Sequence, residues 1–340
     1  MTKNNFHFLR FLFATLVVIS HAYVLSGSTE ENVAINKLSN GQLSFSQIGL
    51  SGFFIISGYF IFQSIERSAT LLRYYKNRFL RLFPGLAVVL ILSLLLSSII
   101  YENKIPFANN SEVYTYIPYN LSLYGFQSSI KGVFDTNTYH SINGSLWTLR
   151  YEFTFYLLLS LLFRIRNSKR LVINLLCLFF LLFNILYNFY LFRYGNSSFL
   201  NLLGVHFLNF GTFFLAGSLL AAIKFETFKY KNIIVLISFC VLLISLYYNY
   251  YDNIKHVALP FLILSLGFVA IKGIENFGKL GDASYGIYIY SFPIQQTLVW
   301  FYKMNTYNLM ICSIVLSIAF GFLSWHLIEK KMLHYKKNDS

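Results

Sequence analysis

The sequence predicts an all-α polytopic membrane protein, a bundle of about ten transmembrane helices with both termini in the cytoplasm. Three observations lead to this prediction. Hydrophobic residues make up 56% of the 340 positions and charged residues only 12%, with a mean hydropathy of +0.56, which a water-soluble domain does not tolerate on its surface. Long apolar runs recur along the whole chain. Linkers rich in lysine and arginine alternate with linkers that are poor in them.

The apolar runs are long enough to cross about 30 Å of hydrocarbon as helices. Most are separated by short polar linkers, but two longer loops lie at 26–46 and 102–145. The second loop contains aromatic and apolar stretches, so we expect a partly ordered cap there. The predicted spans lie near residues 7–25, 47–65, 85–101, 146–163, 171–191, 202–223, 232–250, 256–272, 283–301 and 308–328.

The distribution of lysine and arginine predicts the orientation of the spans. By the positive-inside rule, the basic linkers after even-numbered spans and both termini face the cytoplasm, and the two longer loops face outside. Topology therefore explains much of the net charge of +14, which is no indication of a nucleic-acid partner. The basic positions are Arg67, Arg73, Lys76, Arg78 and Arg81, then Arg164, Arg166, Lys169 and Arg170, then Lys224, Lys229 and Lys231, then Lys272 and Lys279, and finally Lys330, Lys331, Lys336 and Lys337.

The first span carries two polar residues, Arg10 and His21, in an otherwise apolar run. Helical periodicity brings residues eleven positions apart to within roughly 20° of one another, so both side chains lie on one face, about 16 Å apart along the axis. An ionisable group inside a membrane costs roughly 2.5 to 3.5 kcal/mol and usually faces a protein interior or a water-filled cavity. We therefore predict functional roles for both. The alternatives are that Arg10 extends to the headgroups and that His21 only bonds a neighbouring helix.

The second span contains the small residues Gly49, Gly52, Ser57 and Gly58. Small residues in a membrane helix allow close approach of a neighbouring helix, and they also leave room for a slender ligand. Close packing is the default interpretation, and a ligand passage is the alternative.

The basic linker after the second span has Arg78 and Arg81 at a spacing that places them on one helical face beside the membrane. One interpretation is a basic stripe that binds lipid phosphates. The other is a site for a phosphorylated cytoplasmic ligand, because arginine forks bind phosphate well.

The fourth span begins with the stretch Ser145–Glu152 and continues to Tyr156. Because this span enters from outside, we expect Glu152 about six residues, or roughly 9 Å, below the outer surface, at a depth similar to that of His21. A carboxylate beside an imidazole orients the ring and stabilises the imidazolium that forms on proton transfer. We predict a His21–Glu152 dyad. The alternatives are two separate polar contacts, or neutralisation of Glu152 by Arg150.

The three cysteines, Cys177, Cys240 and Cys312, fall in different apolar runs without a CxxC motif. Their spacing suggests neither a disulfide framework nor a zinc site, so we expect no metal. Internal repeats and low-complexity tails are absent from the sequence, and we expect a single integral membrane domain over residues 1–340.

The ninth span contains Pro293, followed by Gln295 and Gln296, in its outer half. Proline at membrane depth frees backbone groups, which then need neighbouring helices or a polar cavity as partners. We therefore expect polar groups to face the interior of the bundle here.

Read together, these stretches resemble the acyltransferase-3 family of integral membrane O-acyltransferases. Enzymes of this family modify bacterial surface polysaccharides, lipopolysaccharide O-antigen, peptidoglycan and Nod factors. The resemblance follows the family's order across nearly the whole chain. Its stretches are Arg10 with His21, Phe53–Gly58, Arg78 with Arg81 and Pro84, Ser145–Glu152 followed by Tyr156, and Gly281–Tyr288.

The resemblance implies a bundle of about ten helices, with acyl-coenzyme A as donor and co-substrate and no tightly bound cofactor. It implies catalysis by His21, with Arg10, Arg78, Arg81 and Glu152 as functional positions. This chain departs from the family at Ser291, where many members have histidine, which puts a role for a second histidine in doubt. We also expect no appended periplasmic hydrolase-like domain.

The predicted chemistry places the donor between the two faces of the membrane. We expect the nucleotide on Arg10, Arg78 and Arg81, and the pantetheine arm in a passage lined by Gly52, Ser57 and Gly58. His21 then acts as general base or as an acyl relay, oriented by Glu152. Residues expected to contact substrate or to stabilise charge are Trp147, Tyr156, Tyr285 and Gln295.

The predicted function is therefore that of a multi-pass O-acyltransferase in the cell (cytoplasmic or inner) membrane. It moves an acyl group, preferentially acetyl, to a hydroxyl of a polysaccharide or a lipid-linked oligosaccharide. The alternatives are a lipid-linked oligosaccharide flippase or other transporter, and a glycan polymerase. A transporter would more readily show inverted repeats with paired broken helices, and a polymerase gives no reason for phosphate-binding arginines on the inside.

Overall fold

The structure is a computed structural model that describes residues 4–269 and 271–335. Lys336, Lys337 and both chain ends lie outside the described residues. The described chain is helical apart from one short antiparallel hairpin, in which β1 (Ser198–Phe199) pairs with β2 (Leu202–Leu203). The prediction of an all-α protein is confirmed.

Thirteen α-helices and several single turns make up the described chain. The α-helices are α1 (Phe6–Leu25), α2 (Ala34–Leu38), α3 (Phe45–Arg67), α4 (Leu71–Ile99), α5 (Ser111–Leu121), α6 (Leu149–Ser160), α7 (Lys169–Tyr194), α8 (Gly204–Ala222), α9 (Lys231–Tyr247), α10 (Tyr251–Phe268), α11 (Ser284–Tyr302), α12 (Thr306–Ser324) and α13 (Lys330–His334). The 3₁₀ turns are η1 (Glu30–Asn32), η2 (Phe107–Asn109), η3 (Gly144–Thr148), η4 (Leu161–Ile165), η5 (Phe225–Thr227) and η6 (Ile274–Lys279), and η7 (Trp325–Glu329) is a π-helical turn.

Each predicted span coincides with one of these helices. In the part of the chain that the structure describes, six helices are long and apolar enough to cross a membrane: α1, α3, α4, α7, α8 and the continuous helix Thr306–His334. The other four predicted spans correspond to α6, α9, α10 and α11, which are shorter or more polar. A multi-pass membrane protein fits this structure, and the count of ten crossings stays a prediction.

Side-chain caps define where several of the long helices begin. Ser44 accepts a hydrogen bond from the Gln47 backbone N–H (3.2 Å) at the start of α3, and Thr70 accepts one from Arg73 (3.2 Å) at the start of α4. Such caps satisfy N–H groups that have no partner inside the helix. Helix α4 therefore begins well before the predicted span at 85, and the basic linker forms its first turns.

Helix α3 lies at the centre of the bundle, between α1 and α8. Close approach depends on glycine: a Cβ on Gly58 would lie 2.0 Å from the carbonyl oxygen of Phe214, and one on Gly217 would lie 2.1 Å from that of Ile55. On the other side, a Cβ on Gly52 would lie 2.2 Å from the Phe13 ring. The small residues Gly52 and Gly58 therefore serve helix packing, and the prediction that they line a ligand passage is wrong.

The loop 102–145 forms the expected cap and then enters the bundle. Asn137 Nδ2 donates to the side-chain oxygen of Gln296 (3.0 Å), and Asn143 Nδ2 donates to the backbone oxygen of Ile289 (2.8 Å). Both asparagines are buried. The chain is therefore already inside the protein several residues before α6 begins.

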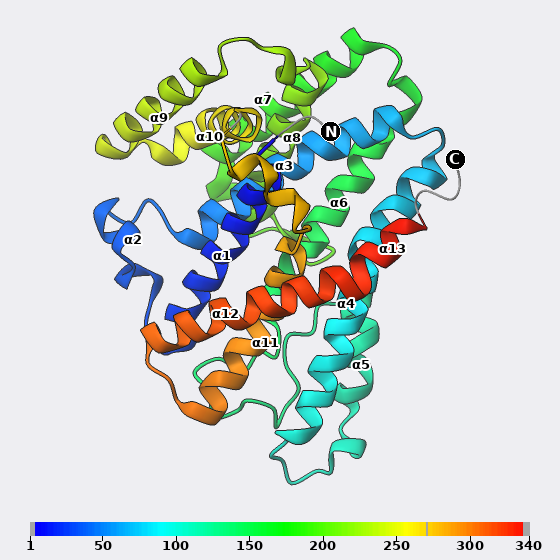
Figure 1. Cartoon of the computed structure of the whole chain (residues 1–340), viewed down its shortest axis with the longest axis vertical. Coiled ribbons are helices and arrows are strands. Elements are labelled where there is room, and N and C mark those ends of the chain that lie inside the picture. Colours follow the sequence, from blue (N-terminus) through cyan, green and yellow to red (C-terminus); the bar gives the residue numbers. More distant parts are fainter. Residues whose placement is uncertain (1–3, 270, 336–340) are drawn as a thin grey trace.

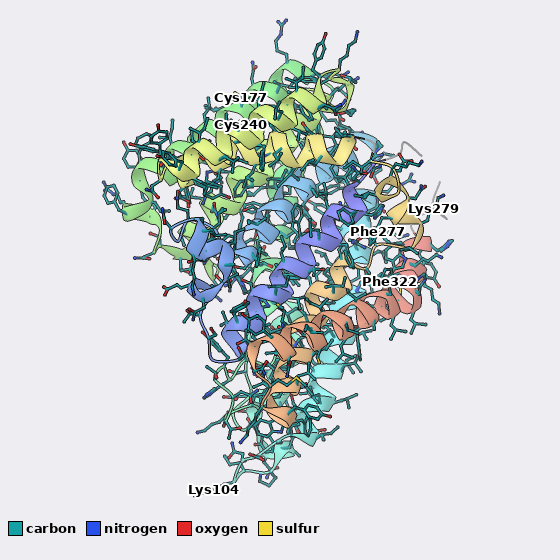
Figure 2. The ribbon with its side chains drawn as sticks, turned by 60° about the vertical axis from the view of Figure 1, so that its left-hand side comes forward. Lys104, Cys177, Cys240, Phe277, Lys279 and Phe322 are labelled. Atoms are coloured by element: carbon teal, nitrogen blue, oxygen red, sulfur yellow. The ribbon has the colours of Figure 1, made fainter. Side chains whose placement is uncertain are left out.

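Figure 1 shows the arrangement of the elements around α1 and α3. Helices α7, α9 and α10 gather at the top, and α4 and α5 extend toward the bottom beside α11. Helix α13 lies near the beginning of α4, with which it makes contact. Figure 2 shows Lys104, in the long loop, at the tip of the molecule, far from Lys279 in η6.

Candidate active site

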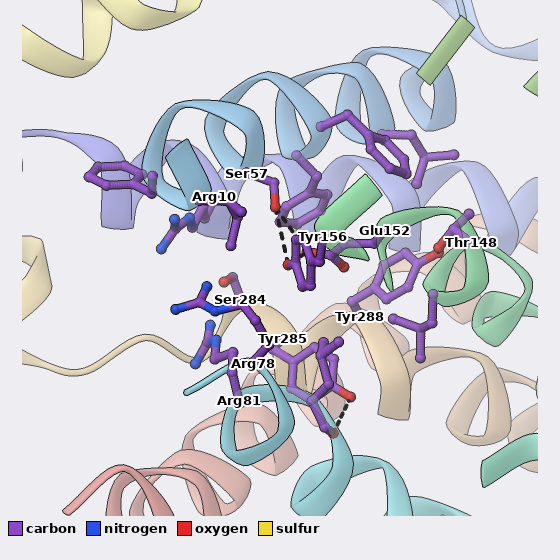
Figure 3. A pocket seen from close by; sticks show the side chains of 17 residues that line it. Arg10, Ser57, Arg78, Arg81, Thr148, Glu152, Tyr156, Ser284, Tyr285 and Tyr288 are labelled. Carbon is purple, nitrogen blue, oxygen red and sulfur yellow. Dashed lines mark hydrogen bonds between the residues drawn. The ribbon is translucent and has the colours of Figure 1, made fainter. Parts of the chain in front are cut away.

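A narrow cavity of about 120 Å³ runs between α1, α3, α4, α6 and α11. Figure 3 shows the guanidinium groups of Arg10, Arg78 and Arg81 at one end of it and Thr148 and Tyr288 at the other. On α3 its lining extends from Leu50 to Ile61, about 16 Å along the helix axis. The cavity is lined by Arg10, Leu50, Phe53, Phe54, Ser57, Phe60, Ile61, Arg78, Arg81, Leu82, Thr148, Leu149, Glu152, Tyr156, Ser284, Tyr285 and Tyr288.

A buried carboxylate, Asp282, holds two of the arginines. Its Oδ2 accepts from Arg81 (2.8 Å) and from Arg10 (3.3 Å), and its Oδ1 accepts from Ser284 (2.5 Å). Burial alone would raise the pKa of the Asp282 carboxyl, but the charges of Arg81 and Arg10 hold that pKa well below its ordinary value. Arg81 also pairs with Glu329 (3.1 Å), which lies in the π-helical turn η7. Arg10 and Arg81 are thus oriented and partly neutralised.

Arg78 is bound differently from the other two arginines. Its guanidinium lies over the Tyr156 ring (5.8 Å to the centroid) and donates a long hydrogen bond to Ser64 (3.4 Å). Its Nε is buried without a hydrogen-bond partner. Among the described residues no carboxylate pairs with Arg78, so this guanidinium can receive an anion without first breaking an ion pair.

The middle of the cavity holds a hydrogen-bonded trio. Ser57 Oγ donates to Glu152 Oε1 (3.0 Å), and the Tyr156 hydroxyl donates to the same carboxylate oxygen. Ser57 Oγ and the Tyr156 hydroxyl are also 3.2 Å apart. Glu152 therefore orients two hydroxyl groups on the wall of the cavity.

His21 lies elsewhere, near the C-terminal end of α1. Its ring makes an edge-to-face contact with Phe292 (5.3 Å between centroids), and its Nδ1 is buried without a hydrogen-bond partner. The preceding residue, Ser20, accepts from the Ser46 backbone N–H (3.3 Å), which places His21 level with the start of α3. Glu152 bonds Ser57, eleven residues further along α3, or about 16 Å away along the axis.

The predicted His21–Glu152 dyad is therefore wrong. The prediction measures the depth of Glu152 from the outer surface and takes α6 to begin at that surface. The chain is already inside the bundle at Asn143, and η3 precedes α6. Glu152 consequently lies much deeper than His21. The carboxylate on the His21 side is Glu30, which accepts hydrogen bonds from Ser20, the residue before His21, and from Ser46 (2.7 Å).

The other residues expected at the site divide into two groups. Tyr156 and Tyr285 line the cavity, and the Tyr285 hydroxyl donates to the Leu82 carbonyl (2.7 Å). Trp147 does not line it and packs against His206 (4.6 Å). Gln295 ties α11 to α1 by donating to the Val18 carbonyl (2.8 Å), and its Oε1 is buried without a partner. Its amide nitrogen is therefore used to hold α11 against α1.

Sequence reasoning did not assign Asp282, Glu329, Thr148, Ser284 or Tyr288 to the site. Asp282 and Ser284 belong to the stretch Gly281–Tyr288, which is named in the sequence analysis. A carboxylate between two apolar runs is the sequence feature that could have indicated Asp282. Tyr288 donates to the Ser145 carbonyl (2.7 Å) and contacts Thr148 (2.6 Å), beside the buried stretch before α6. Within residues 4–269 and 271–335 the structure has no cluster of three or more metal-ligating side chains.

Comparisons with known proteins show what the whole chain is similar to. A family model described as an acyltransferase domain, that of acyltransferase family 3, matches residues 3–327. An O-acetyl transferase of Shigella phage Sf6 is 28% identical over 348 aligned positions, 98% of this chain and 97% of its own. Nodulation protein 10 of Rhizobium leguminosarum bv. viciae is 31% identical over 185 positions, 49% of this chain and 46% of its own. No solved structure matches the chain. The chain belongs to the acyltransferase-3 family and is a multi-pass membrane acyltransferase.

Proposed function

We propose that the protein is an O-acyltransferase of the cell membrane that moves an acetyl group from cytoplasmic acetyl-coenzyme A to a hydroxyl of a surface polysaccharide. The observation that carries the proposal is the narrow cavity, with three guanidinium groups at one end and, at the other, Leu50, about 6 Å along α3 from the level of His21. The similarity to the O-acetyl transferase of phage Sf6 supports the choice of acetyl.

The cavity fits the shape of the donor. A small cavity of about 120 Å³ suits a slender chain better than a bulky nucleotide. We infer that the phosphorylated nucleotide stays at the mouth, on Arg78 and beside Arg10 and Arg81, since guanidinium forks bind phosphate oxygens in pairs. The pantetheine arm then runs past Ser57 and Tyr156. Glu152 contributes by orienting these two hydroxyl groups.

The far end of the cavity brings the thioester toward His21. Leu50 lines that end. It follows Ser46, which is level with His21, by four residues of α3, or about 6 Å along the helix axis. Phe53 and Tyr288 also line the cavity, with ring centroids 6.0 Å apart.

His21 acts as general base in the transfer. The imidazole takes the proton of the acceptor hydroxyl as its oxygen attacks the thioester carbonyl carbon. The new C–O bond forms and the C–S bond breaks, and the leaving thiolate takes the proton from the imidazolium. An ester and free coenzyme A result. Glu30, beside Ser20, stabilises the transient positive charge on the ring.

The test is transfer of radiolabelled acetyl from acetyl-coenzyme A to surface polysaccharide in membranes that contain the full-length chain. Wild type is expected to transfer label, and His21→Ala is expected to lose at least about 100-fold of the rate, because a general base contributes about that much or more. The donor KM is expected to stay unchanged, since His21 does not line the donor cavity.

His140→Ala is the matched control, because His140 is exposed on the loop 102–145. It is expected to retain the wild-type rate. Normal transfer by His21→Ala at equal membrane abundance would remove His21 from the mechanism. Failure of wild type to transfer label to any polysaccharide fraction of its host would overturn the proposed function.

A further inference from the structure

A second cavity opens on the side of the molecule opposite the arginines. It has a volume of about 580 Å³, within the range of about 300 to 1,000 Å³ that is usual for small-ligand sites. It lies between the end of α1, the end of α11 and the loop 102–145. Its lining residues are Leu25, Ser26, Glu102, Thr136, Asn137, Thr138, Val299, Trp300, Lys303 and Met304.

The lining combines one large aromatic face with hydrogen-bonding groups of both kinds. Trp300 is half-buried, and its ring packs against Phe134 (5.9 Å between centroids), which fixes its orientation. Glu102 supplies acceptor oxygens and Lys303 supplies donors, and both are exposed. A sugar ring has an apolar C–H face and a rim of hydroxyl groups that donate and accept. The cavity is complementary to such a ring.

The wall formed by Thr136, Asn137 and Thr138 is held in place before any ligand binds. Asn137 is buried, and its Nδ2 donates to both the backbone oxygen (3.1 Å) and the side-chain oxygen (3.0 Å) of Gln296 on α11. Gln296 in turn donates to the backbone oxygens of Tyr139 and Ser141 (2.5 Å each). This network makes the wall rigid, so the wall loses less conformational entropy when a ligand binds.

The cavity lies next to His21. Leu25, in its lining, follows His21 by one helical turn, or about 6 Å along α1. Leu25 packs in one cluster with Phe292, whose ring contacts His21. The cavity therefore begins about one helical turn from His21 on the side away from the arginines, and the donor cavity ends on the arginine side.

We propose that this outer cavity binds a sugar residue of the acceptor, with Trp300 beneath the ring and Glu102, Asn137 and Lys303 around its hydroxyl groups. The proposal rests on the proposed function, since it names where that reaction takes its acceptor. A sugar held here presents a hydroxyl toward His21.

The experiment measures the acceptor KM and the donor KM separately in membranes with the full-length chain. The acceptor is the host's surface polysaccharide after alkaline removal of its O-acetyl groups, and the donor is radiolabelled acetyl-coenzyme A. Trp300→Ala and Glu102→Gln are each expected to raise the acceptor KM roughly tenfold, as the loss of one good contact does. The donor KM is expected to change less than about twofold.

The matched controls are Phe301→Ala and Glu31→Gln. Phe301 is the exposed aromatic next to Trp300, Glu31 is an exposed carboxylate in η1, and neither lines the cavity. Both are expected to retain the wild-type acceptor KM. If Trp300→Ala reduces membrane abundance, Glu102→Gln at normal abundance decides the question.

An acceptor KM equal to wild type in the cavity variants would overturn this proposal and leave the proposed function standing. A parallel rise of donor and acceptor KM would also contradict it, because that result indicates general damage. Absence of transfer by wild type would overturn the proposed function and this inference with it.

Discussion

At the scale of single residues, the three arginines of the donor cavity differ in whether a carboxylate pairs with them. Arg10 and Arg81 share Asp282, and Arg81 also pairs with Glu329. Arg78 instead contacts Ser64 and the rings of Tyr74 and Tyr156, with no carboxylate paired to it among the described residues. An anion gains most from a guanidinium that keeps no competing carboxylate. Arg78 is therefore the position at which the donor phosphate is expected to bind most tightly.

Arg78→Gln is expected to raise the KM for acetyl-coenzyme A about tenfold or more, because a hydrogen bond to a charged group contributes about 1.5 to 3 kcal/mol. The acceptor KM is expected to remain unchanged. The measurement is the rate of labelled acetyl transfer at varied donor concentration.

Arg67→Gln provides the comparison, because Arg67 belongs to the same basic linker, is exposed and does not line the cavity. Its donor KM is expected to equal that of wild type. An equal rise in both variants would show that only the overall positive charge of the linker matters.

At the scale of elements, neighbouring residues of α3 have separate tasks because a helix turns by about 100° per residue. Gly58 faces α8, where Ser218 donates to its carbonyl oxygen (3.0 Å) and the Phe214 backbone leaves no space for a side chain. Ser57 faces the donor cavity and bonds Glu152. One face of α3 thus stabilises the bundle and the next carries the candidate site.

Gly58→Ala is expected to lower the melting temperature of the detergent-purified protein, because its Cβ would lie 2.0 Å from the Phe214 oxygen. Overpacking of this kind costs about 1 to 3 kcal/mol. Ser57→Ala adds no volume and is expected to lower the transfer rate, since it removes a hydrogen bond to Glu152 in the donor cavity. A Gly58→Ala protein as stable as wild type would contradict the close packing of α3 against α8.

At the scale of the whole molecule, the two cavities approach His21 from opposite directions. The donor cavity ends at Leu50 on the arginine-rich side of His21, and the outer cavity begins at Leu25, one helical turn beyond it on the side of the loop 102–145. This arrangement suits a donor and an acceptor that come from different sides of a membrane. It requires the orientation that the positive-inside rule predicts.

Cysteine labelling tests that orientation. In a chain whose three cysteines are replaced by serine, Lys104→Cys is expected to react with a membrane-impermeant maleimide in intact cells. Lys279→Cys is expected to react only after the cells are permeabilised. Both positions are exposed and lie far apart (Figure 2). Labelling of position 279 in intact cells would show the reverse orientation, with the arginines outside.

Composition and local pattern predict the helical membrane class and the charged residues of the donor cavity. Hydropathy depends on composition within one segment, and helical periodicity places Arg78 and Arg81 on one face without reference to the rest of the chain. Arg10, Ser57, Glu152 and Tyr156 were likewise recognisable as polar groups in apolar or membrane-adjacent runs.

Which groups lie opposite each helix face depends on the tertiary structure. Asp282 meets Arg10 and Arg81 across more than 200 residues of sequence, and periodicity says nothing about such partners. The depth of Glu152 depended on a loop that enters the bundle before its helix begins, which hydropathy does not reveal. Gly58 and Ser57 are both small residues, and they differ in role because only Gly58 packs against α8. The local sequence specifies which groups are costly to bury, and the fold decides which of them meet.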